Sequence, residues 1–278
     1  MEFLSAAQVP METHVSLFND AFTGYIGGQV NMTLPGYYGF INAGNVDVNI
    51  SGFAMDGDTP AAFGMVARQG GTCRLAVMGV SQAHQGQRVG AWLLDKLIEQ
   101  ARQREDKTYI LECFEQNTRG IKLYQRLGFE ITERLMGYTY QQENAQDTPV
   151  PELEQVDVYE VARQLIWYGD QSLPWQSSGT QIARLGAPHV GYKLGEAYGV
   201  FSDPSADVAT VRALVVPPEH QNQGHAKALI QAVMRLHAGS RQWRIGQICP
   251  EWVGQRTFEK LGFERMELNQ VQMRLRLS

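Results

Sequence analysis

The chain has 278 residues, of which 44% are hydrophobic and 19% charged, enough apolar material for roughly two globular domains. This composition excludes a disordered tail protein, a collagen-like fibre and a disulfide-stapled miniature. Lys and Arg number 24 against 29 Asp and Glu, and a net charge of −5 is not that of a nucleic-acid binder or of a polybasic membrane-binding protein.

The first half of the chain predicts strands that alternate with helices. Residues 18–53 are rich in Tyr and Gly and poor in charge, which fits either the wall of a ligand pocket or a surface that packs against the second half. Residues 91–104 place their apolar side chains on one helical face. The elements predicted beyond residue 53 are a strand at 73–80, a helix at 91–104, a strand at 108–114, a helix at 118–127 that Gly128 ends, and a strand at 138–141.

The second half predicts the same order of elements. The polar stretch QQENAQDTPVPELEQ, with two prolines, favours a linker between the halves. Beyond it we expect a strand at 208–216, a helix at 224–237, a strand at 243–249, a helix at 253–261 that Gly262 ends, and a strand at 271–277.

Two separate matches show that the halves are copies of one unit. VSQAHQGQRVGAWLL from Val80 matches VPPEHQNQGHAKALI from Val216. Further along each half, YQRLGFE from Tyr124 matches FEKLGFE from Phe258. Two matches in the same order at nearly the same offset indicate a duplication. We therefore predict domains at 1–142 and 150–278, both of the α/β class, each a central mixed β-sheet flanked by helices.

The loops that follow residues 80 and 216 are candidate anion sites. Each is rich in small and polar residues and leads into a helix, whose first amides have no partner within the helix and whose dipole favours negative charge. The alternative is a plain strand-to-helix turn. The chain has no Gly-x-x-x-x-Gly-Lys-Ser/Thr, Gly-x-Gly-x-x-Gly, Gly-x-Ser-x-Gly or His-Glu-x-x-His motif, so other phosphate, hydrolase and zinc signatures are missing.

Both loops resemble the acyl-CoA loop of the GNAT (Gcn5-related N-acetyltransferase) superfamily, Val-x-Pro-x-x-Arg/Gln-x-x-Gly-x-Gly/Ala. The second half fits at Val216, Pro218, Gln221, Gly224 and Ala226. The first half fits at Val80, Gln85 and Gly90, with Gln82 in place of Pro and Arg88 in place of the first Gly. The resemblance implies two such domains in tandem and acetyl-CoA as co-substrate. The donor-binding residues that it implies are Met78, Val80, Gln85, Gly86, Gln87, Arg88, Val89, Gly90, Ala91 and Asn117 in the first half, and Val216, Gln221, Gly224 and Ala226 in the second.

The family's downstream segment, Asn-x-x-Ala-x-x-x-Tyr-x-x-x-Gly-Phe, runs from Asn117 to Phe129. By resemblance Asn117 contacts the pantetheine arm or holds a water, and Tyr124 protonates the departing thiolate. The alternative for Tyr124 is a core aromatic on a short helix. In the second half Glu251 and Phe258 stand at these two positions. We therefore expect catalysis in the first half, and a second half that either still binds CoA or only supports the fold.

The general base is not fixed by any motif. Glu112 is a candidate, because it shares a strand face with apolar residues, where an unpaired carboxylate is costly. The alternative is an edge position open to solvent. His84 and His220 lie in the loops, and we expect both to be solvated.

The resemblance thus implies an enzyme that moves an acetyl group from acetyl-CoA to a primary amine of a small molecule or peptide. The oxyanion is expected on a backbone N–H near Val80, at the end of the strand. The rival interpretations are a non-catalytic CoA-binding sensor or scaffold, and an interaction protein that binds no CoA. The identity of the acceptor, the length of the acyl chain and the choice between monomer and homodimer stay open.

The three cysteines are widely spaced in the sequence and bear on redox state and metal binding. Cys73, Cys113 and Cys249 form no Cys-x-x-Cys pair and have no His at metal-ligand spacing, which predicts reduced thiols and no bound metal. The N-terminus does not resemble a secretory signal, and no apolar run approaches the roughly 20 residues that span a bilayer. We expect a cytoplasmic protein without nucleic-acid or membrane partners.

Overall fold

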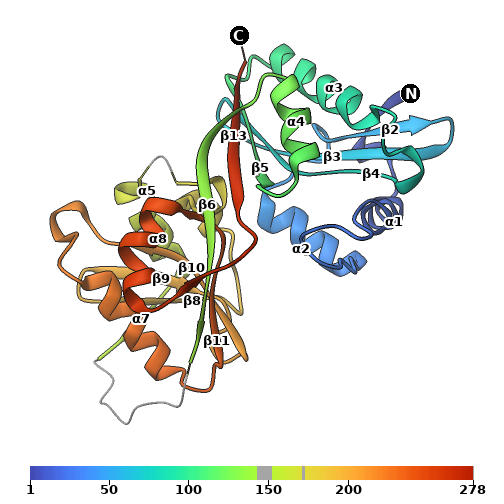
Figure 1. Cartoon of the computed structure of the whole chain (residues 1–278). Helices are drawn as coiled ribbons and strands as arrows, with labels where there is room; N and C mark the ends of the chain where they lie inside the picture. The colour runs from blue at the N-terminus through green and yellow to red at the C-terminus, as the bar shows by residue number, and fades with distance from the viewer. Residues whose placement is uncertain (143–151, 171–172, 278) are drawn as a thin grey trace. The chain divides into compact units, whose positions relative to one another are not determined.

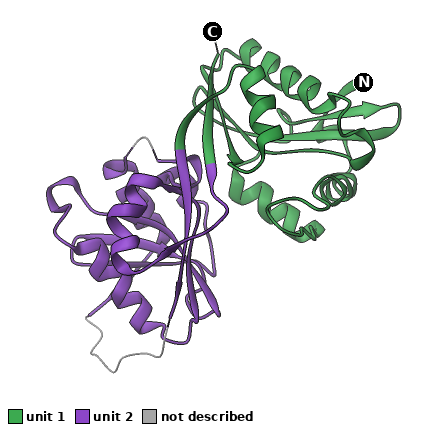
Figure 2. Cartoon of the chain, in the orientation of Figure 1, with its two compact units in different colours: residues 1–133, 271–278 green, residues 134–270 purple. Residues whose placement is uncertain are grey.

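The computed structural model describes residues 1–142, 152–170 and 173–277. The chain forms two compact units, one of Met1–Glu133 with Val271–Ser278 and the other of Arg134–Gln270 (Figure 2). Each unit is a mixed β-sheet flanked by helices, as Figure 1 shows. The predicted α/β class is therefore confirmed for both halves.

The sheet of the first unit has the strand order β1-β2-β3-β4-β5-β13-β6. Neighbours from β1 to β4 are antiparallel, whereas β4 and β5 are parallel. The strands span Glu2–Ser5 (β1), Gly52–Asp56 (β2), Thr59–Gln69 (β3), Thr72–Val80 (β4), Thr108–Phe114 (β5), Gln270–Arg276 (β13) and Glu130–Gln141 (β6).

Helices cover both faces of this sheet. Helices α1 (Met11–Ala21) and α2 (Leu34–Gly44) share one hydrophobic cluster with it, and α3 (Val89–Gln103) and α4 (Thr118–Arg126) pack against a second. The predicted face of α3 is buried at Leu93, Leu94, Leu97, Ile98 and Ala101. The regions of α1 and α2 were not predicted to be helical.

The second unit repeats this architecture with the strand order β6-β11-β10-β9-β8-β7 and β12 paired to β6. Here β10 and β11 form the parallel pair. The strands span Glu154–Val156 (β7), Val190–Leu194 (β8), Ala197–Phe201 (β9), Val208–Val215 (β10), Gln242–Pro250 (β11) and Glu264–Arg265 (β12). The helices span Val158–Tyr168 (α5), Gly179–Ile182 (α6), His225–Leu236 (α7) and Glu251–Thr257 (α8). The single helix expected at 253–261 is instead α8 followed by a 3₁₀ turn at Glu259–Leu261.

The last strand of each sequence half pairs with strands of the other half. Strand β6 begins in the first unit, but its residues from Leu135 to Gln141 pair with β11. Strand β13, at the end of the chain, is hydrogen-bonded to β5 in the first unit. The boundaries between the two compact units therefore follow residues 133 and 270. Of the stretch 141–155 predicted as a linker, residues 143–151 lie outside the described residues, whereas Gln141 belongs to β6 and Glu154 and Gln155 belong to β7. The domain limits 1–142 and 150–278 stay a prediction.

Each sheet opens between its two parallel strands. The register of β4 with β5 covers only Thr72 to Leu75, although β4 continues to Val80. The register of β10 with β11 covers only Val208 to Thr210. A β-bulge follows in both strands, at Ala76 in β4 and at Arg212 in β10, which are matching positions of the two copies. Bulges bend a strand and end its pairing, so each sheet has a gap in its middle at the end that carries the predicted loop.

Candidate active site

The loops before α3 (residues 81–88, the first loop) and before α7 (residues 217–224, the second loop) follow the same backbone path. Each begins with a 3₁₀ turn, at Gln82–His84 and Pro218–His220. Two left-handed residues follow, Gly86 and Arg88 in the first loop and Asn222 and Gly224 in the second. Arg88 has φ 65° and Gly224 has φ 88°, so the first loop keeps its shape although an arginine replaces the glycine.

A glutamine ties each loop to the end of its strand. The side-chain amide of Gln85 donates to the carbonyl oxygen of Val80 at 3.4 Å, and that of Gln221 donates to Val216 at 3.0 Å. In the same way Gln87 donates to the Ala83 carbonyl oxygen at 2.9 Å. These predicted donor-binding residues therefore hold the loop in place with their side chains.

The start of α3 lies directly against the end of β4. A Cβ added at Gly90 would lie 3.0 Å from Val80 Cγ2 and 3.7 Å from Met78 Cε. Val89, Gly90 and Ala91 form the first turn of α3, where amides have no partner within the helix. The missing side chain of Gly90 thus lets the start of α3 pack closely against β4, and the unpaired amides of this turn are suited to bind a phosphate.

The free edge of β4 presents two amides to the gap in the sheet. The Ser81 N–H donates to the Ala61 carbonyl oxygen at 2.9 Å, toward β3. Since N–H groups alternate along a strand, those of Met78 and Val80 point away from β3, toward the side of β5. The pairing of β4 with β5 ends at Leu75, before Met78 and Val80, so the amides of these two residues face the gap.

Tyr124 lies on α4 beside this gap. Its ring meets Phe129 edge to face, with 6.1 Å between the ring centroids. Burial raises the pKa of the Tyr124 phenol, and the neighbouring Cys113 thiol and Tyr25 phenol raise it further. The phenol therefore keeps its proton at neutral pH, as a general acid must.

A second phenol that the sequence analysis did not single out, Tyr25, lies in the same place. It follows α1 and packs against Phe114 of β5, with 5.9 Å between the centroids. Burial raises the pKa of Tyr25 and Cys113 raises it further, whereas a hydrogen bond from Asn117 opposes the shift. One residue of the Tyr- and Gly-rich stretch thus reaches the predicted catalytic group; no sequence pattern distinguishes it from the other tyrosines there.

Asn117 is the N-cap of α4. Its Oδ1 accepts the Gly120 N–H at 3.0 Å. Because its amide also bonds to Tyr25, the side chain is already engaged at both ends. Asn117 therefore fixes the start of α4 and with it the position of Tyr124.

Glu112 is buried in an ion pair with Arg74, its neighbour on β4. Arg74 Nη2 and Nε lie 2.7 and 2.9 Å from Glu112 Oε2, and only 9% and 4% of the two side chains are exposed. The alternative of an edge position open to solvent is therefore wrong. The guanidinium supplies the pairing that a buried carboxylate needs.

His84 is not solvated as expected. Only 12% of its side chain is exposed, with Nδ1 2.7 Å from Ser81 Oγ and Nε2 3.4 Å from Asp56 Oδ2. It braces the first loop against the end of β2. His220 instead lines a cavity in the second unit and faces His225, with 6.1 Å between ring centroids.

That cavity has a volume of about 840 Å³, within the usual range for small-molecule sites. All four residues predicted for the second half line it, Val216, Gln221, Gly224 and Ala226. The structure thus brings the second strand end, the second loop and the start of α7 around one hollow.

The residues aligned with Asn117 and Tyr124 differ in this unit. Phe258 lines the cavity and packs against Tyr138 and Phe263, with 5.8 and 5.6 Å between centroids. Glu251 is the first residue of α8 and forms ion pairs with Arg134 and Arg265 at 3.1 and 2.9 Å. It therefore acts as a surface pairing group, and Pro250 takes the N-cap position that Asn117 has in α4.

Comparisons with known proteins decide the family. The model of the Acetyltransferase (GNAT) family matches residues 15–129, and that of the Acetyltransferase (GNAT) domain matches residues 184–265. One match lies within each unit. The chain belongs to the GNAT acetyltransferase family. It is a GNAT-type N-acetyltransferase with two such domains in tandem, as the sequence predicts.

Solved structures share the GNAT fold over the whole chain. A GCN5-related N-acetyltransferase from Sphaerobacter thermophilus has a TM-score of 0.69 at 13% identity, covering 99% of this chain and 96% of that one. A putative acetyltransferase from Pyrococcus horikoshii has a TM-score of 0.65 at 17% identity, covering 100% and 89%. A tandem GNAT protein from the clavulanic acid biosynthesis pathway has 0.62 at 14%, covering 100% and 98%. A comparison with curated proteins gave no significant match.

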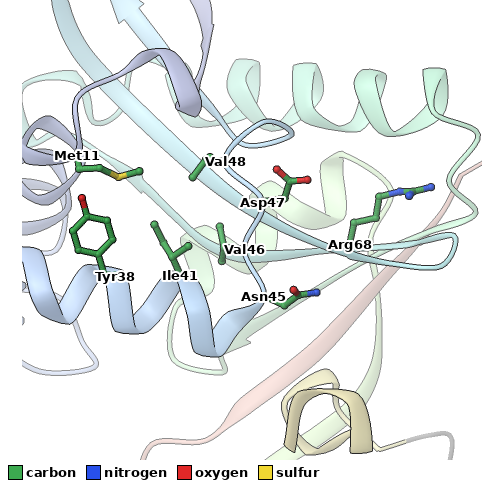
Figure 3. Close-up of a pocket in the computed structure, with 8 residues that line it drawn as sticks. All are labelled: Met11, Tyr38, Ile41, Asn45, Val46, Asp47, Val48 and Arg68. Atoms are coloured by element: carbon green, nitrogen blue, oxygen red, sulfur yellow. The ribbon is translucent and has the colours of Figure 1, made fainter. Parts of the chain in front are cut away.

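The first GNAT unit also contains a hollow of about 450 Å³ away from this site (Figure 3). Figure 3 shows Tyr38 and Ile41 of α2 near Met11, with Asp47 and Arg68 toward the other end. Arg68 is held by Asp106, with 2.7 Å between Nε and Oδ1. None of the predicted donor-binding or catalytic residues lines this hollow.

The described residues contain neither a metal-binding cluster nor a candidate membrane span. Among residues 1–142, 152–170 and 173–277, no group of three or more His, Cys, Asp or Glu side chains is placed to hold a metal ion. Within the same part of the chain, no helix is both long and apolar enough to cross a membrane.

Proposed function

We propose that the first unit transfers the acetyl group of acetyl-CoA to a primary amine of a small molecule or peptide, with Tyr124 as general acid. The observation that supports this most is the position of its phenol at the gap in the sheet, beside Cys113 and Tyr25. On the other side of the gap are the outward amides of Met78 and Val80, and the start of α3.

The residues divide the reaction between them. The amides at the start of α3 hold the pyrophosphate of acetyl-CoA. An outward N–H of β4 near Val80, on the side of the bulge, holds the oxygen that becomes negative when the amine attacks the thioester carbon. As the carbon–sulfur bond breaks, the leaving thiolate takes the proton of the Tyr124 phenol. The ammonium proton passes to Glu112, the proposed base, before the attack. A second proton of the same nitrogen restores the Tyr124 phenol once the carbon–sulfur bond has broken.

The second unit is proposed to be a second donor site. All four predicted residues line its cavity, and Phe258 stands at the position that matches Tyr124 but has no hydroxyl proton to give. CoA binding without turnover is therefore the second candidate function, and it applies to this unit. We further propose a cytoplasmic location, in keeping with three free, buried cysteines, and a monomer or homodimer.

Replacing Tyr124 by Phe tests the proposal. Removing the acid should lower kcat about hundredfold while KM for acetyl-CoA stays within a factor of a few. The assay follows CoA thiol release with a panel of primary amines and peptides. Tyr159→Phe, on the exposed side of α5, serves as the matched control and should act as the parent protein. An unchanged kcat in Tyr124→Phe would exclude the phenol as the acid.

A further inference from the structure

One cationic side chain of the second unit has no role in the donor site described above. Arg212 lines the 840 Å³ cavity and occupies the bulge of β10. It precedes Val216 by four residues, about 13 Å at the usual rise of a strand. It is therefore too far from the second loop to bind the phosphates there, and it lies toward the part of the cavity where the proposed donor site would hold the thioester.

Arg212 has no partner among the described residues. Its Nε is buried and makes no hydrogen bond, and no carboxylate pairs with the guanidinium. Burial lowers the pKa of Arg212 from its usual value, and the group stays charged at physiological pH. A largely buried charge without a partner is costly, so no ion pair within the described residues accounts for this arginine.

The other charged groups around the cavity are placed differently. Lys227 is in the first turn of α7, beside the second loop, where it suits phosphates. Arg256 is stacked over the Trp252 ring at 5.9 Å, and Lys260 also lines the cavity. Asp170 is the acidic residue of the lining, so cations prevail there although the whole chain is acidic.

We propose that Arg212 binds a carboxylate on the ligand of the second unit, at the thioester end of the cavity. A guanidinium presents its donors as a fork that matches the two oxygens of a carboxylate. The carboxylate belongs either to the acyl chain of a dicarboxylic acyl-CoA or to an amino-acid acceptor. In the first unit Ala76 occupies the matching bulge, so that site has no such cation. The inference rests on the donor site proposed for the second unit.

Titration of acyl-CoA thioesters tests the first source. The full chain carries Gly90→Leu to displace the start of α3 from β4 and so disable the first donor site, because any Cβ there meets Val80 at 3.0 Å. Malonyl-CoA should bind this protein at least tenfold more tightly than acetyl-CoA. Adding Arg212→Met should bring that ratio to about one, with acetyl-CoA affinity changed less than twofold. Lys227→Met is the matched control and should weaken both thioesters equally.

A second titration tests whether the carboxylate belongs to an amino-acid acceptor. With acetyl-CoA bound, the Gly90→Leu protein is titrated with amino acids and with their carboxamides. A preference of at least tenfold for the free carboxylate, lost in Arg212→Met, assigns the carboxylate to the acceptor. If acetyl-CoA binds and neither preference depends on Arg212, the inference is overturned.

Failure of the donor site is distinguishable from failure of the inference. If no acyl-CoA binds the Gly90→Leu protein, the donor site of the second unit is refuted, and malonate alone is titrated. Malonate binding that disappears in Arg212→Met supports the carboxylate site, and no malonate binding overturns it. The melting temperature of Arg212→Met should not fall; a large fall would instead make Arg212 a structural group.

Discussion

At the scale of single residues, one hydroxyl group separates the two copies. Tyr124 and Phe258 stand at matching positions and pack on the phenylalanine that follows the helix, Phe129 or Phe263. The sequence reveals this difference because the flanking residues align. It does not reveal the partners of these rings, such as Tyr25, because contacts between distant segments leave no local pattern. The Arg74–Glu112 ion pair likewise joins residues far apart in the sequence, and no local pattern predicts it.

Replacing Glu112 by Gln separates its two roles. Gln keeps the shape but leaves the Arg74 guanidinium buried without its carboxylate, so the free energy of unfolding should fall by about 3 kcal/mol. Denaturant unfolding measures this loss. If Glu112 is also the base, kcat of the folded variant should fall about hundredfold. Glu99→Gln, on the exposed side of α3, is the control. A folded Glu112→Gln enzyme with the parent kcat would rule out the base.

His14 gives the protein a dependence of stability on pH. The side chain is fully buried, its Nε2 donates to the Ala6 carbonyl oxygen at 3.1 Å, and its Nδ1 accepts from the Tyr37 hydroxyl at 2.9 Å. Both bonds suit the neutral ring, and burial lowers the pKa of His14 below its usual 6.5. The unfolded chain therefore binds a proton near pH 6.5 that the folded chain does not.

The free energy of unfolding should therefore fall as the pH drops below about 6.5 toward the lowered pKa of His14. Urea unfolding between pH 5 and pH 8 measures the slope. His237, whose pKa burial also lowers, contributes in the same direction. His14→Gln should reduce the slope but not abolish it. The same slope in His14→Gln and parent protein would contradict this assignment.

At the scale of elements, local sequence patterns predict most of the helices and strands from residue 73 onward. The strand expected at 108–114 has the bounds of β5, and the helix ends at Gly128 and Gly262 have φ 90° and 86°. The helices α1 and α2 could not be predicted in this way. The sequence LPGYYGFINAG of α2 has three glycines and aromatic side chains, poor helix formers that tertiary packing overrides.

Arg88 shows how an element tolerates an unsuitable residue. Its left-handed conformation costs an ordinary side chain roughly 1–2 kcal/mol, whereas Gly224 has it freely in the second loop. Arg88→Gly should therefore raise the free energy of unfolding by about 1 kcal/mol. Thermal and urea unfolding measure the gain. Gly86→Ala, at φ 80°, should act in the opposite direction, and a loss of stability in Arg88→Gly would mean that the guanidinium stabilises the loop.

At the scale of the whole molecule, the sequence predicts the duplication. It does not predict which sheet the last strand of each half joins. Residues 138–141 and 271–277 both read as strands, and nothing local says which sheet each one joins. Pairing depends on the fit of buried side chains across distant strands. The sequence therefore predicted two copies laid end to end, whereas the structure gives β13 to the first unit.

This assignment makes a prediction that two domains in sequence order would not make. Met273 is fully buried in the cluster that α3, β4 and β5 form, although it lies near the end of the chain. Met273→Ala should lower the free energy of unfolding of the first unit by about 3 kcal/mol, because it leaves a cavity in that core. The exposed neighbour Arg274→Ala should have little effect.

Hydrogen exchange resolves where the loss occurs. In Met273→Ala, amides of α3 and β4 should exchange faster, and those of α7 and β10 should keep their protection. Loss of protection in α7 instead would place β13 in the second unit. Acetyl transfer should fail at a lower temperature in the same variant, since the proposed acid Tyr124 packs against the same cluster. A substitution in the last strand of the chain would then act on a site built from the first half of the sequence.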